Sequence, residues 1–345
     1  MRSVNDYGKL MHVKIRKNVK LARYTTFHVG GPAEFFAEVN SVGEVKGVVD
    51  FVKKNKLKLF ILGGGSNVLL PDKGMKGLVL KVNIKGIKFR NNLTSAGAGE
   101  IWDNIVAKAV AKGLSGIENL SLIPGTVGGA VYQNIGAYGM ELKDVLDSVE
   151  VFDIKSLAVK RFSNKKCYFG YRQSIFQQSE NPRYIILEAG LKLSKNYVPN
   201  VEYPDLVKYF GSKKASLSEM RKAIIKIRKT KLVYPSDSIG TAGSFFKNPI
   251  VSSALFNKII KQQPDIKGRE TDRGRIKLFA GQLVEEAGWK GKRLGSVGAS
   301  EKHSMVLVSY KGGKAVDIVK LSNLIRKSVK DKFGVDLEPE VKIMA

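Results

Sequence analysis

The sequence predicts an α+β or mixed α/β protein with a larger N-terminal unit and a smaller C-terminal unit. Apolar residues at helical spacing alternate with short apolar runs that are typical of strands. The length of 345 residues is enough for two to three domains of about 150 residues each. A loop of small polar residues after Pro235 indicates a boundary. We therefore expect a first unit over 1–215, a connecting helix over 216–231 and a second unit over 232–345.

The N-terminal unit is predicted to open with a β-α-β arrangement. Val45, Val48, Val49 and Val52 recur at the spacing of one helix face, and this helix should end near Asn55. A second helix is indicated by the apolar residues of 101–110, with Gly113 as its C-cap. Strands are expected over 33–39, 57–62, 78–82, 148–154 and 183–193.

The connecting helix has a sequence signal at its start. Ser216 and Glu219 form the pattern of a capping box, and apolar residues follow on one face. Beyond it we expect helices over 252–262 and 280–288, a strand over 303–310, a helix over 318–333 capped by Gly334, and a last strand through Val341.

The composition excludes several classes of site. Hydrophobic residues make up 43% of the chain and charged residues 26%, which is typical of a folded protein. The single cysteine, Cys167, rules out an internal disulfide and every multi-cysteine metal site, and three histidines argue against a histidine-rich one. No apolar run approaches the roughly 20 residues of a membrane-spanning helix, and 1–21 lacks the apolar segment of a signal peptide. We therefore expect a cytoplasmic protein with no metal and no membrane partner.

The formal net charge of +28 raises nucleic acid as a partner. The lysines are spread through the whole chain, however, and no sequence signature of a nucleic-acid-binding module is present. We expect a solvated, lysine-rich surface and no nucleic-acid partner, with part of the charge attracting phosphorylated small molecules. A basic nucleic-acid-binding protein is the less favoured alternative.

Three glycine clusters are the strongest local signal. Glycine lets the backbone approach a ligand closely, and successive N–H groups can surround a phosphate. Ordinary tight turns are the alternative for any one cluster, whereas three clusters together favour phosphate binding. Val68 breaks the G-x-G-x-x-G pattern and Ala315 breaks the G-x-x-x-x-G-K-[ST] pattern, so neither common nucleotide-binding motif is present. The clusters are Gly30-Gly31-Pro32, Gly63-Gly64-Gly65-Ser66-Asn67 and Pro124-Gly125-Thr126-Val127-Gly128-Gly129-Ala130.

Three further segments, 171–176, 243–249 and 338–341, gather polar side chains beside aromatic residues or proline. In the last, Glu338 and Glu340 should lie on one face of a strand, because residues two apart share a face. Taken singly, structural roles are the more common interpretation: Arg172 as a salt-bridge partner, Glu340 as a surface charge and Ser244 as a helix N-cap.

Taken together and in this order, these segments resemble the UDP-N-acetylenolpyruvoylglucosamine reductase family, flavoenzymes of bacterial peptidoglycan precursor synthesis. The resemblance extends over 24–341. It implies an FAD-binding domain of the vanillyl-alcohol-oxidase type in two lobes, about 1–82 and 83–215, followed by a substrate-binding domain whose last strand returns to the active site. It also implies bound FAD, NADPH as hydride donor, and the enolpyruvyl ether of UDP-N-acetylglucosamine as the substrate that is reduced to UDP-N-acetylmuramate. The matching segments are 26–33, 62–69, 123–139, 171–176, 243–249, 280–285 and 338–341.

The resemblance also implies roles for individual residues. The catalytic residues of the family fall on Arg172, Ser244 and Glu340. The substrate-binding residues fall on Tyr171, Lys231 and Asn248, and Tyr203 lies in a stretch similar to the tyrosine-bearing insertion of the longer subtype. FAD would be held by Gly63, Gly64, Gly65, Ser66, Asn67, Pro124, Gly125, Thr126, Gly128, Gly129 and Ala130.

The implied residue types suit the implied chemistry. Hydride addition to an alkene that carries a carboxylate builds a second negative charge, which the guanidinium of Arg172 would stabilise. Ser244 would protonate the resulting carbanionic centre, and a protonated Glu340 would donate a hydrogen bond to its oxygen. We expect a monomer. The runner-up interpretation is another FAD oxidoreductase or oxidase of the same flavin fold.

Overall fold

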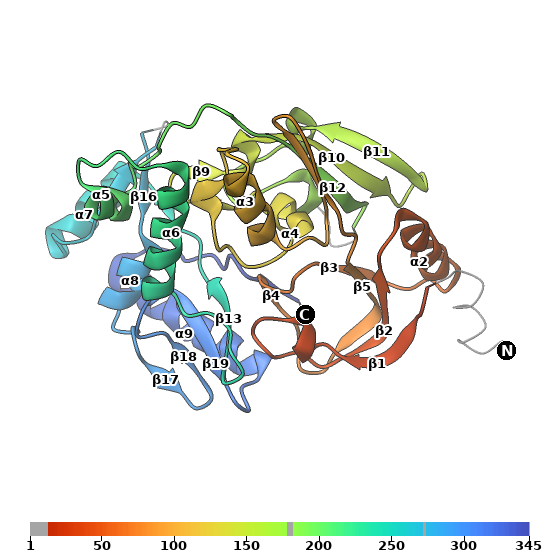
Figure 1. Ribbon diagram of the computed structural model, residues 1–345. Coiled ribbons are helices and arrows are strands. Elements are labelled where there is room, and N and C mark those ends of the chain that lie inside the picture. Colours follow the sequence, from red (N-terminus) through yellow and green to blue (C-terminus); the bar gives the residue numbers. More distant parts are fainter. Residues whose placement is uncertain (1–12, 178–181, 272–273, 345) are drawn as a thin grey trace. The chain divides into compact units, whose positions relative to one another are not determined.

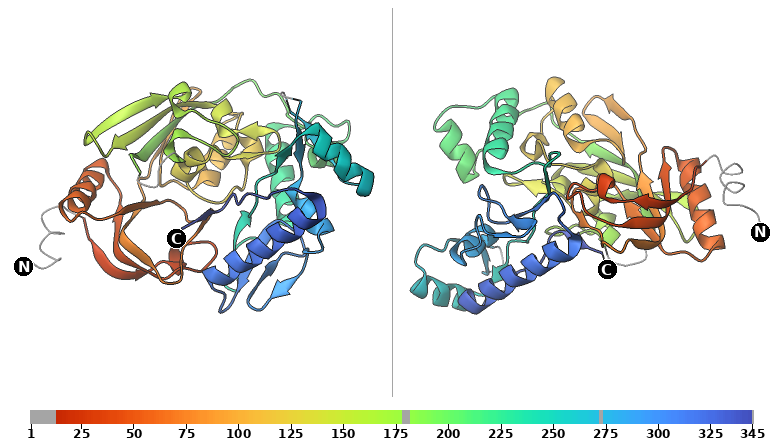
Figure 2. Two further views of the ribbon diagram at one scale, coloured as in Figure 1. Left: turned by 180° about the vertical axis from the view of Figure 1, so that it is seen from behind. Right: turned by 90° about the horizontal axis from the view of Figure 1, so that it is seen from below.

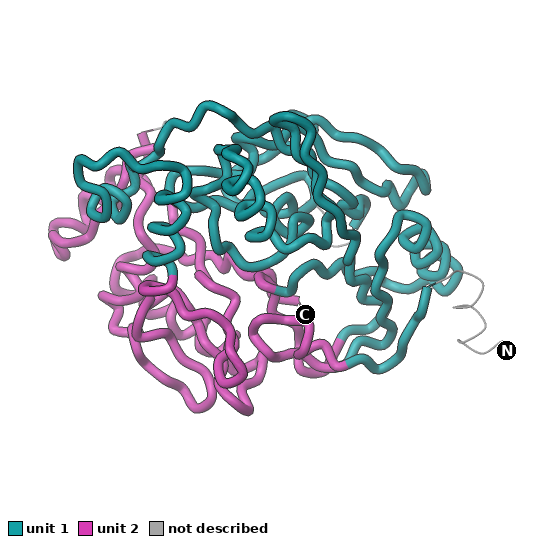
Figure 3. Tube along the Cα trace, viewed as in Figure 1, with its two compact units in different colours: residues 1–19, 32–65, 75–228 teal, residues 20–31, 66–74, 229–345 magenta. Residues whose placement is uncertain are grey.

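The computed structural model describes residues 13–177, 182–271 and 274–344, so most of the segment in which no signal peptide is expected lies outside it. The chain forms two compact units (Figure 3). Unit 1 consists of residues 1–19, 32–65 and 75–228, and unit 2 consists of residues 20–31, 66–74 and 229–345. Unit 2 therefore contains two short N-terminal segments as well as the C-terminal third of the chain. The assignment of domains at 215 and 232 by function stays a prediction.

Unit 1 contains a sheet in the order β1-β2-β5-β3, formed by Arg16–Lys20, Pro32–Val39, Met75–Val82 and Leu59–Leu62. β5 pairs in parallel with both β2 and β3, so the predicted β-α-β opening is confirmed. The crossover helix α2 (Val42–Lys54) begins where the Ser41 side chain accepts a hydrogen bond from Glu44 N–H, and its C-cap is Asn55. Its predicted apolar face is buried in the core of the unit.

A second sheet of unit 1 is antiparallel (Figure 1). Helix α4 (Val127–Tyr132) packs on its strands β12 and β7. Helix α3 (Trp102–Ala111) ends two residues before Gly113, which has a φ of +68° and so allows the chain to turn. The strand order is β11-β10-β12-β7-β6, formed by Ala158–Ser163, Leu146–Asp153, Tyr184–Lys192, Leu93–Gly97 and Ile87–Arg90.

Helix α6 (Leu217–Lys231) begins with the predicted capping box. Ser216 N–H donates to the Glu219 carboxylate at 2.9 Å, and Glu219 N–H donates to Ser216 Oγ at 3.3 Å. The apolar face of α6 packs with α5 (Pro204–Phe210) in a small separate core.

Unit 1 also has the hairpin β8 (Gly136–Ala137) and β9 (Met140–Glu141). Short 3-10 helices in unit 1 cover Glu118–Leu120, Leu142–Asp144, Asn164–Cys167 and Ile175–Gln177.

Unit 2 is built on an antiparallel sheet in the order β13-β19-β18-β17. The long helix α9 (Ala315–Phe333), dark blue in Figure 2, packs on β18 and β19 through its predicted apolar stripe and ends at Gly334 with a φ of +68°. These strands are Ile239–Ser244, Val306–Tyr310, Val297–Ala299 and Arg293–Leu294. The other elements are a 3-10 helix Ala22–Tyr24, α7 (Ser253–Gln262), α8 (Ala280–Glu286), and a small sheet of β14 (Ile250–Val251), β16 (Ile276–Leu278) and β15 (Gly268–Glu270).

The end of the chain differs from the prediction. The last strand, β20 (Lys342–Ile343), begins after Val341 and pairs in parallel with β4 (Val68–Leu69). Glu338 and Glu340 precede this strand, so the expectation that they share a strand face is wrong. Pro339 explains the difference, because it lacks an N–H and disfavours a regular ladder; it makes a single bridge to Phe246.

Candidate active site

Two glycine-rich loops of unit 1 lie against each other. A Cβ on Gly63 would be 2.8 Å from Thr126 Oγ1, and a Cβ on Gly64 would be 2.9 Å from Gly125 Cα. Gly125 has a φ of +115°, a backbone conformation that residues with a side chain rarely adopt. The loops can therefore approach this closely because the residues facing each other have no side chain.

These loops present polar groups that have no partner among the described residues. Within the described residues, the N–H groups of Gly63, Gly64, Gly125 and Gly129 donate no hydrogen bond. Thr126 is the N-cap of α4 but makes no capping bond, and its buried Oγ1 has no partner in the described part of the chain. Such a set of donors around a space without side chains suits an anion. We call the N–H groups of Gly63, Gly64, Gly125 and Gly129 together with the Thr126 hydroxyl the glycine cradle. These groups fit the pyrophosphate of a bound dinucleotide.

The backbone N–H groups of two predicted cofactor-binding residues, Gly128 and Ala130, donate hydrogen bonds within the protein. Gly128 N–H donates to Ala98 O at 2.9 Å, and a Cβ on Gly128 would lie 3.1 Å from Ala98 Cβ. The N–H of Ala130 donates to Thr126 O at 2.8 Å, which begins the hydrogen bonding of α4, and its side chain is buried. Neither N–H is therefore available to a phosphate, and the contact of Gly128 and Ala130 with FAD stays a prediction.

The first glycine cluster serves a turn inside unit 2. Gly31 N–H donates to Pro71 O at 2.9 Å, and Gly31 O accepts from Leu21 N–H at 3.1 Å. Gly30 has a φ of +127°. The ordinary tight-turn interpretation is therefore the one that fits this cluster.

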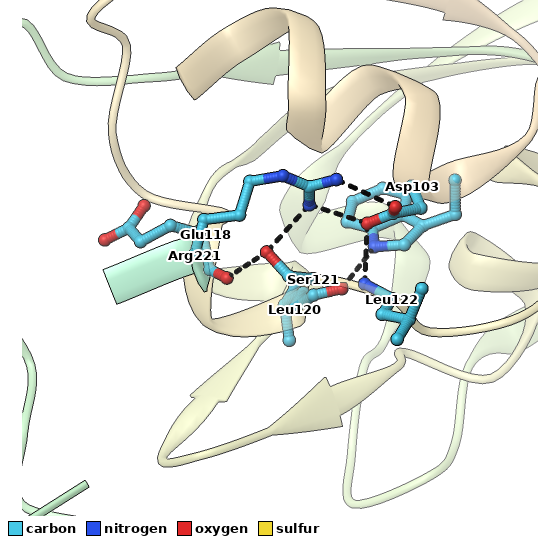
Figure 4. A network of polar contacts seen from close by, with 7 residues as sticks. Asp103, Glu118, Leu120, Ser121, Leu122 and Arg221 are labelled. Carbon is cyan, nitrogen blue, oxygen red and sulfur yellow. Dashed lines mark hydrogen bonds and ion pairs between the residues drawn. The ribbon is translucent and has the colours of Figure 1, made fainter. Parts of the chain in front are cut away.

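A network of polar contacts in unit 1 fixes the chain just before the third glycine cluster (Figure 4). Arg221 of α6 makes two hydrogen bonds to the carboxylate of Asp103, at 2.7 and 2.8 Å, and a third to Ser121 Oγ at 2.9 Å. Asp103 also accepts from Leu122 N–H at 2.6 Å, and Leu122 has a φ of +58°. Burial alone would raise the pKa of Asp103, but the bonds from Arg221 and Leu122 lower it below its ordinary value.

The predicted Arg172 is half-buried in unit 1, in the turn 170–173. Gly170 and Gln173 close this turn by exchanging backbone hydrogen bonds of 3.0 and 3.1 Å. Arg172 has a φ of +55°, its Nη2 donates to Gly136 O at 2.7 Å, and its guanidinium lies 5.3 Å from the ring centre of Tyr171. Two predicted site residues, Tyr171 and Arg172, are thus in direct contact.

Tyr203 immediately precedes α5 and is 38% exposed. Its ring lies edge-to-face on the ring of Tyr138, with 5.0 Å between centres. The side-chain amide of Asn119 holds the backbone of this region, donating to Tyr138 O at 2.9 Å and to Asn200 O at 3.1 Å. Tyr138 lies in the matched segment 123–139 but carried no predicted role.

The backbone segments that carry Ser244 and Glu340 pair with each other in unit 2. Ser244 is the last residue of β13, so the helix N-cap interpretation is wrong. Glu340 N–H donates to Phe245 O at 2.7 Å, and Lys247 N–H donates to Glu338 O at 2.8 Å. The segments 244–247 and 338–340 therefore run side by side, with both predicted catalytic residues half-buried.

Buried aromatic residues anchor this part of unit 2. Phe245 and Phe246 follow Ser244 directly and are 0% and 1% exposed. Their rings meet edge-to-face at 5.2 Å, and Phe245 packs on Phe27 at 6.3 Å. The backbone that carries Ser244 is thus held by the core of the unit.

The remaining predicted residues of unit 2 differ in their surroundings. Asn67 donates from its side chain to Glu340 O at 3.1 Å and accepts from Lys342 N–H at 3.1 Å, so it lies beside a predicted catalytic residue. Asn248 Oδ1 accepts from Ala280 N–H at 3.0 Å and thereby holds the start of α8.

Lys231 is exposed at the end of α6. Ser66 also belongs to unit 2, whereas Pro124 and Gly65 belong to unit 1.

Within the described ranges, no helix combines the length and apolar character that crossing a membrane requires. The same residues contain no cluster of three or more His, Cys, Asp or Glu placed to hold a metal ion.

Comparison with known proteins adds to this geometry. Residues 33–159 match a family model described as an FAD binding domain, and residues 234–344 match one described as the C-terminal domain of UDP-N-acetylenolpyruvoylglucosamine reductase. The reductase of Pseudomonas savastanoi pv. phaseolicola is 38% identical over 338 residues, covering 96% of this chain and 99% of the relative. The reductase of Bdellovibrio bacteriovorus is 40% identical over 335 residues, covering 95% and 99%.

A solved structure agrees with these relatives. The crystal structure of the UDP-N-acetylenolpyruvylglucosamine reductase of Thermus caldophilus matches with a TM-score of 0.69 and 27% identity, and it covers 96% of this chain and 99% of that one. The expected fold class, an FAD-binding domain followed by a distinct C-terminal domain with mixed helices and strands, is confirmed.

Proposed function

Because the chain belongs to the UDP-N-acetylenolpyruvoylglucosamine reductase family, we propose that it reduces the enolpyruvyl ether of UDP-N-acetylglucosamine to UDP-N-acetylmuramate through Arg172, Ser244 and Glu340. The reaction belongs to peptidoglycan precursor synthesis. FAD is the cofactor; when bound, it takes two electrons from NADPH and supplies them to the double bond as hydride. The observation that supports the assignment of residues is the Glu340 N–H bond to Phe245 O, which joins the segments that carry Glu340 and Ser244.

The glycine cradle of unit 1 supports the binding of FAD. The N–H groups of Gly63, Gly64, Gly125 and Gly129 would donate to the pyrophosphate, together with the hydroxyl of Thr126. A side chain on Gly63 or Gly64 would fill the space between the loops, since its Cβ would already be within 3 Å of the opposite loop. The other residues that we propose contact FAD are Gly65, Ser66, Asn67, Pro124, Gly128 and Ala130.

Arg172 would bind the carboxylate of the enolpyruvyl group. A guanidinium stays charged at every physiological pH and can donate two parallel hydrogen bonds to one carboxylate. As negative charge moves onto that group during reduction, the attraction strengthens. A preorganised donor of this kind is worth about 3 kcal/mol of transition-state stabilisation.

Ser244 would supply a proton to the intermediate, and Glu340 would stabilise its enolate oxygen. The Ser244 hydroxyl would donate its proton to the carbon beside the ether oxygen, because that carbon is strongly basic once the carboxylate holds extra charge. A protonated Glu340 would donate a hydrogen bond to the enolate oxygen. The pairing of the segments that carry them in unit 2 supports a shared task.

Four further residues would bind the substrate. Tyr171 packs against Arg172, and Tyr203 lies on a segment held by Asn119. Asn248 would act through its Nδ2, because its Oδ1 accepts a bond from Ala280 N–H. Lys231 would contact a phosphate from its exposed position.

The test is Ser244→Ala in the full-length protein. We expect the variant to bind FAD and to be bleached by NADPH at the normal rate, whereas reoxidation by the enolpyruvyl substrate falls by about 100-fold or more. Ser252→Ala is the matched control: Ser252 caps α7 by accepting from Leu255 N–H, so its loss should lower stability by about 1 kcal/mol without slowing reoxidation. Normal turnover of Ser244→Ala would refute the proton-donor role. A wild-type flavin that reacts with oxygen but not with the substrate would indicate an oxidase.

The same proposal includes a cytoplasmic, monomeric enzyme that acts on small molecules and has no nucleic-acid partner. A UDP-sugar and NADPH are substrates found inside the cell, which supports this location. Light scattering on the purified protein should give the mass of one chain. A shift of an oligonucleotide at physiological salt would contradict the absence of a nucleic-acid partner.

A further inference from the structure

Asn134 is a fully buried polar side chain beside the turn that carries Arg172. Its exposed fraction is 0%. Its Nδ2 donates to Gly170 O at 3.0 Å and to Glu141 Oε2 at 3.0 Å, and its Oδ1 accepts from Lys143 N–H at 3.0 Å. One amide thus joins the turn 170–173 to the residues of the β8–β9 hairpin and to the chain that follows it.

A second contact joins the same two segments. Arg172 Nη2 donates to Gly136 O, which belongs to strand β8, at 2.7 Å. The backbone of Arg172 is in the left-handed region, with a φ of +55°. A non-glycine residue keeps this conformation when the surrounding structure holds it there, and such residues often occur at functional sites.

We propose that Asn134 is a positioning residue for Arg172. Its bond to Gly170 O sets the turn two residues before the arginine, and its bond to Glu141 sets the hairpin whose carbonyl receives the guanidinium. The hydrogen bonds of Asn134 thus hold the backbone on either side, and the Arg172–Gly136 bond holds the guanidinium. The proposal rests on the proposed function, in which Arg172 binds the substrate carboxylate.

Gly136 completes this arrangement. A Cβ on Gly136 would be 2.9 Å from Arg172 Nη1, 2.9 Å from Met140 O and 3.0 Å from Glu141 Cγ. The space is enclosed by backbone as well as by side chains, so an added methyl group would displace the guanidinium. Gly136 therefore leaves room for Arg172 in the position that Asn134 determines.

The test is Asn134→Asp, which exchanges the donating Nδ2 for an acceptor and keeps the oxygen that faces Lys143 N–H. In stopped-flow experiments on the FAD-loaded protein, we expect a normal rate of flavin reduction by NADPH. Reoxidation by the enolpyruvyl substrate should be slower by about 10- to 100-fold, because Arg172 no longer sits where the carboxylate binds. A double-mutant cycle with Arg172→Lys should give a combined loss well below the product of the two single losses.

Asn164→Asp is the matched control. Asn164 lies in the same unit and its amide likewise donates two hydrogen bonds, to Lys143 O at 2.6 Å and Leu146 O at 2.8 Å, but neither of them reaches the turn 170–173. We expect this variant to lose stability while reoxidation stays within twofold of the wild type. Equal slowing of reoxidation in both variants would show a general loss of structure and would overturn the proposal, as would multiplicative effects in the cycle.

Gly136→Ala tests the positioning of Arg172 if Asn134→Asp fails to fold, because its Cβ would lie 2.9 Å from Arg172 Nη1 while Asn134 itself is unchanged. Slower reoxidation with normal reduction by NADPH supports the positioning of Arg172, and normal rates of both steps overturn it. Reoxidation of the wild-type flavin by the substrate distinguishes a failure of this proposal from a failure of the proposed function. If the wild-type flavin is not reoxidised by the substrate, the proposed function itself is wrong, whereas a normal wild type with normal variants refutes the role of Asn134 and Gly136.

Discussion

Arg221 and Asp103 form a two-point ion pair, with nitrogen–oxygen distances of 2.7 and 2.8 Å, between helix α6 and helix α3. Both side chains are largely covered, at 15% and 23% exposure. The pair also reaches the segment before the third glycine cluster, because Ser121 and Leu122 bond to the same two side chains. The ion pair therefore contributes to the shape of the cradle that would hold FAD.

We predict that Asp103→Asn lowers both stability and FAD content. Removing one partner leaves Arg221 partly buried without its counter-ion, which costs about 3 kcal/mol. The loss should be measured as the free energy of unfolding in urea and as flavin absorbance per protein. Lys46, which pairs with Asp50 on the exposed side of α2, offers a control: Asp50→Asn should change stability by less than about 1 kcal/mol. Full FAD content and unchanged stability in Asp103→Asn would contradict the role of the pair.

The same pair predicts a pH dependence. The pKa of Asp103 is lowered in the folded protein, so its contribution to stability is complete above the unfolded value of 3.8 and is lost as the pH falls through the lower, folded value. The wild type should therefore lose more stability than Asp103→Asn between pH 6 and acidic pH. Urea unfolding at a series of pH values measures this difference. Parallel curves for the two proteins would show that Asp103 is not the group responsible.

Gly64→Ala should abolish FAD binding. The added Cβ would lie 2.9 Å from Gly125 Cα, so the two loops would separate and the N–H groups would no longer converge. We expect a colourless protein after purification and no recovery on adding FAD. Gly43→Ala in α2 is the control, because its Cβ would meet no atom closer than 4.0 Å; alanine there should stabilise the helix by up to about 1 kcal/mol. A yellow Gly64→Ala protein would contradict the cradle.

Glu340→Gln and Glu338→Gln should differ sharply. Glu338 is exposed and pairs with Lys247 at 2.6 Å, whereas Glu340 is half-buried and its N–H donates to the carbonyl of Phe245, the residue after Ser244. We expect reoxidation by the substrate to fall by about 10-fold or more in Glu340→Gln, because an amide N–H is a weaker hydrogen-bond donor to the enolate oxygen than a carboxylic acid O–H. Glu338→Gln should stay within about twofold, since exposed ion pairs contribute little. Equal rates in the two variants would refute the assignment of Glu340.

Cys167 should resist thiol reagents in the folded protein. Its side chain is buried, and burial raises the pKa of the thiol to about 11, so the reactive thiolate is scarce at neutral pH. Labelling with a chromogenic disulfide should be slow in buffer and complete within minutes in denaturant. Rapid stoichiometric labelling of the native protein would contradict the burial.

Local sequence determined most of the helices and strands of this protein. The i, i+3, i+4, i+7 spacing of four valines located α2, and the Ser216–Glu219 capping box located the start of α6. These signals depend on residues close together in the chain, so they can be found without knowledge of the fold. The ordered motifs likewise indicated the family and FAD, which the relatives confirm.

Long-range packing decided how the individual site residues are used. The glycines of the third cluster look alike in the sequence, yet within the described part of the chain the N–H groups of Gly125 and Gly129 donate no hydrogen bond, while Gly128 N–H donates to Ala98 O. Asn134 carried no predicted role, because its bond to Gly170 spans 36 residues. Glu340 reaches Phe245 by a backbone bond from a segment that Pro339 keeps out of a regular strand. Partners so distant in the sequence leave no local pattern, and the tertiary structure alone brings them within hydrogen-bonding distance.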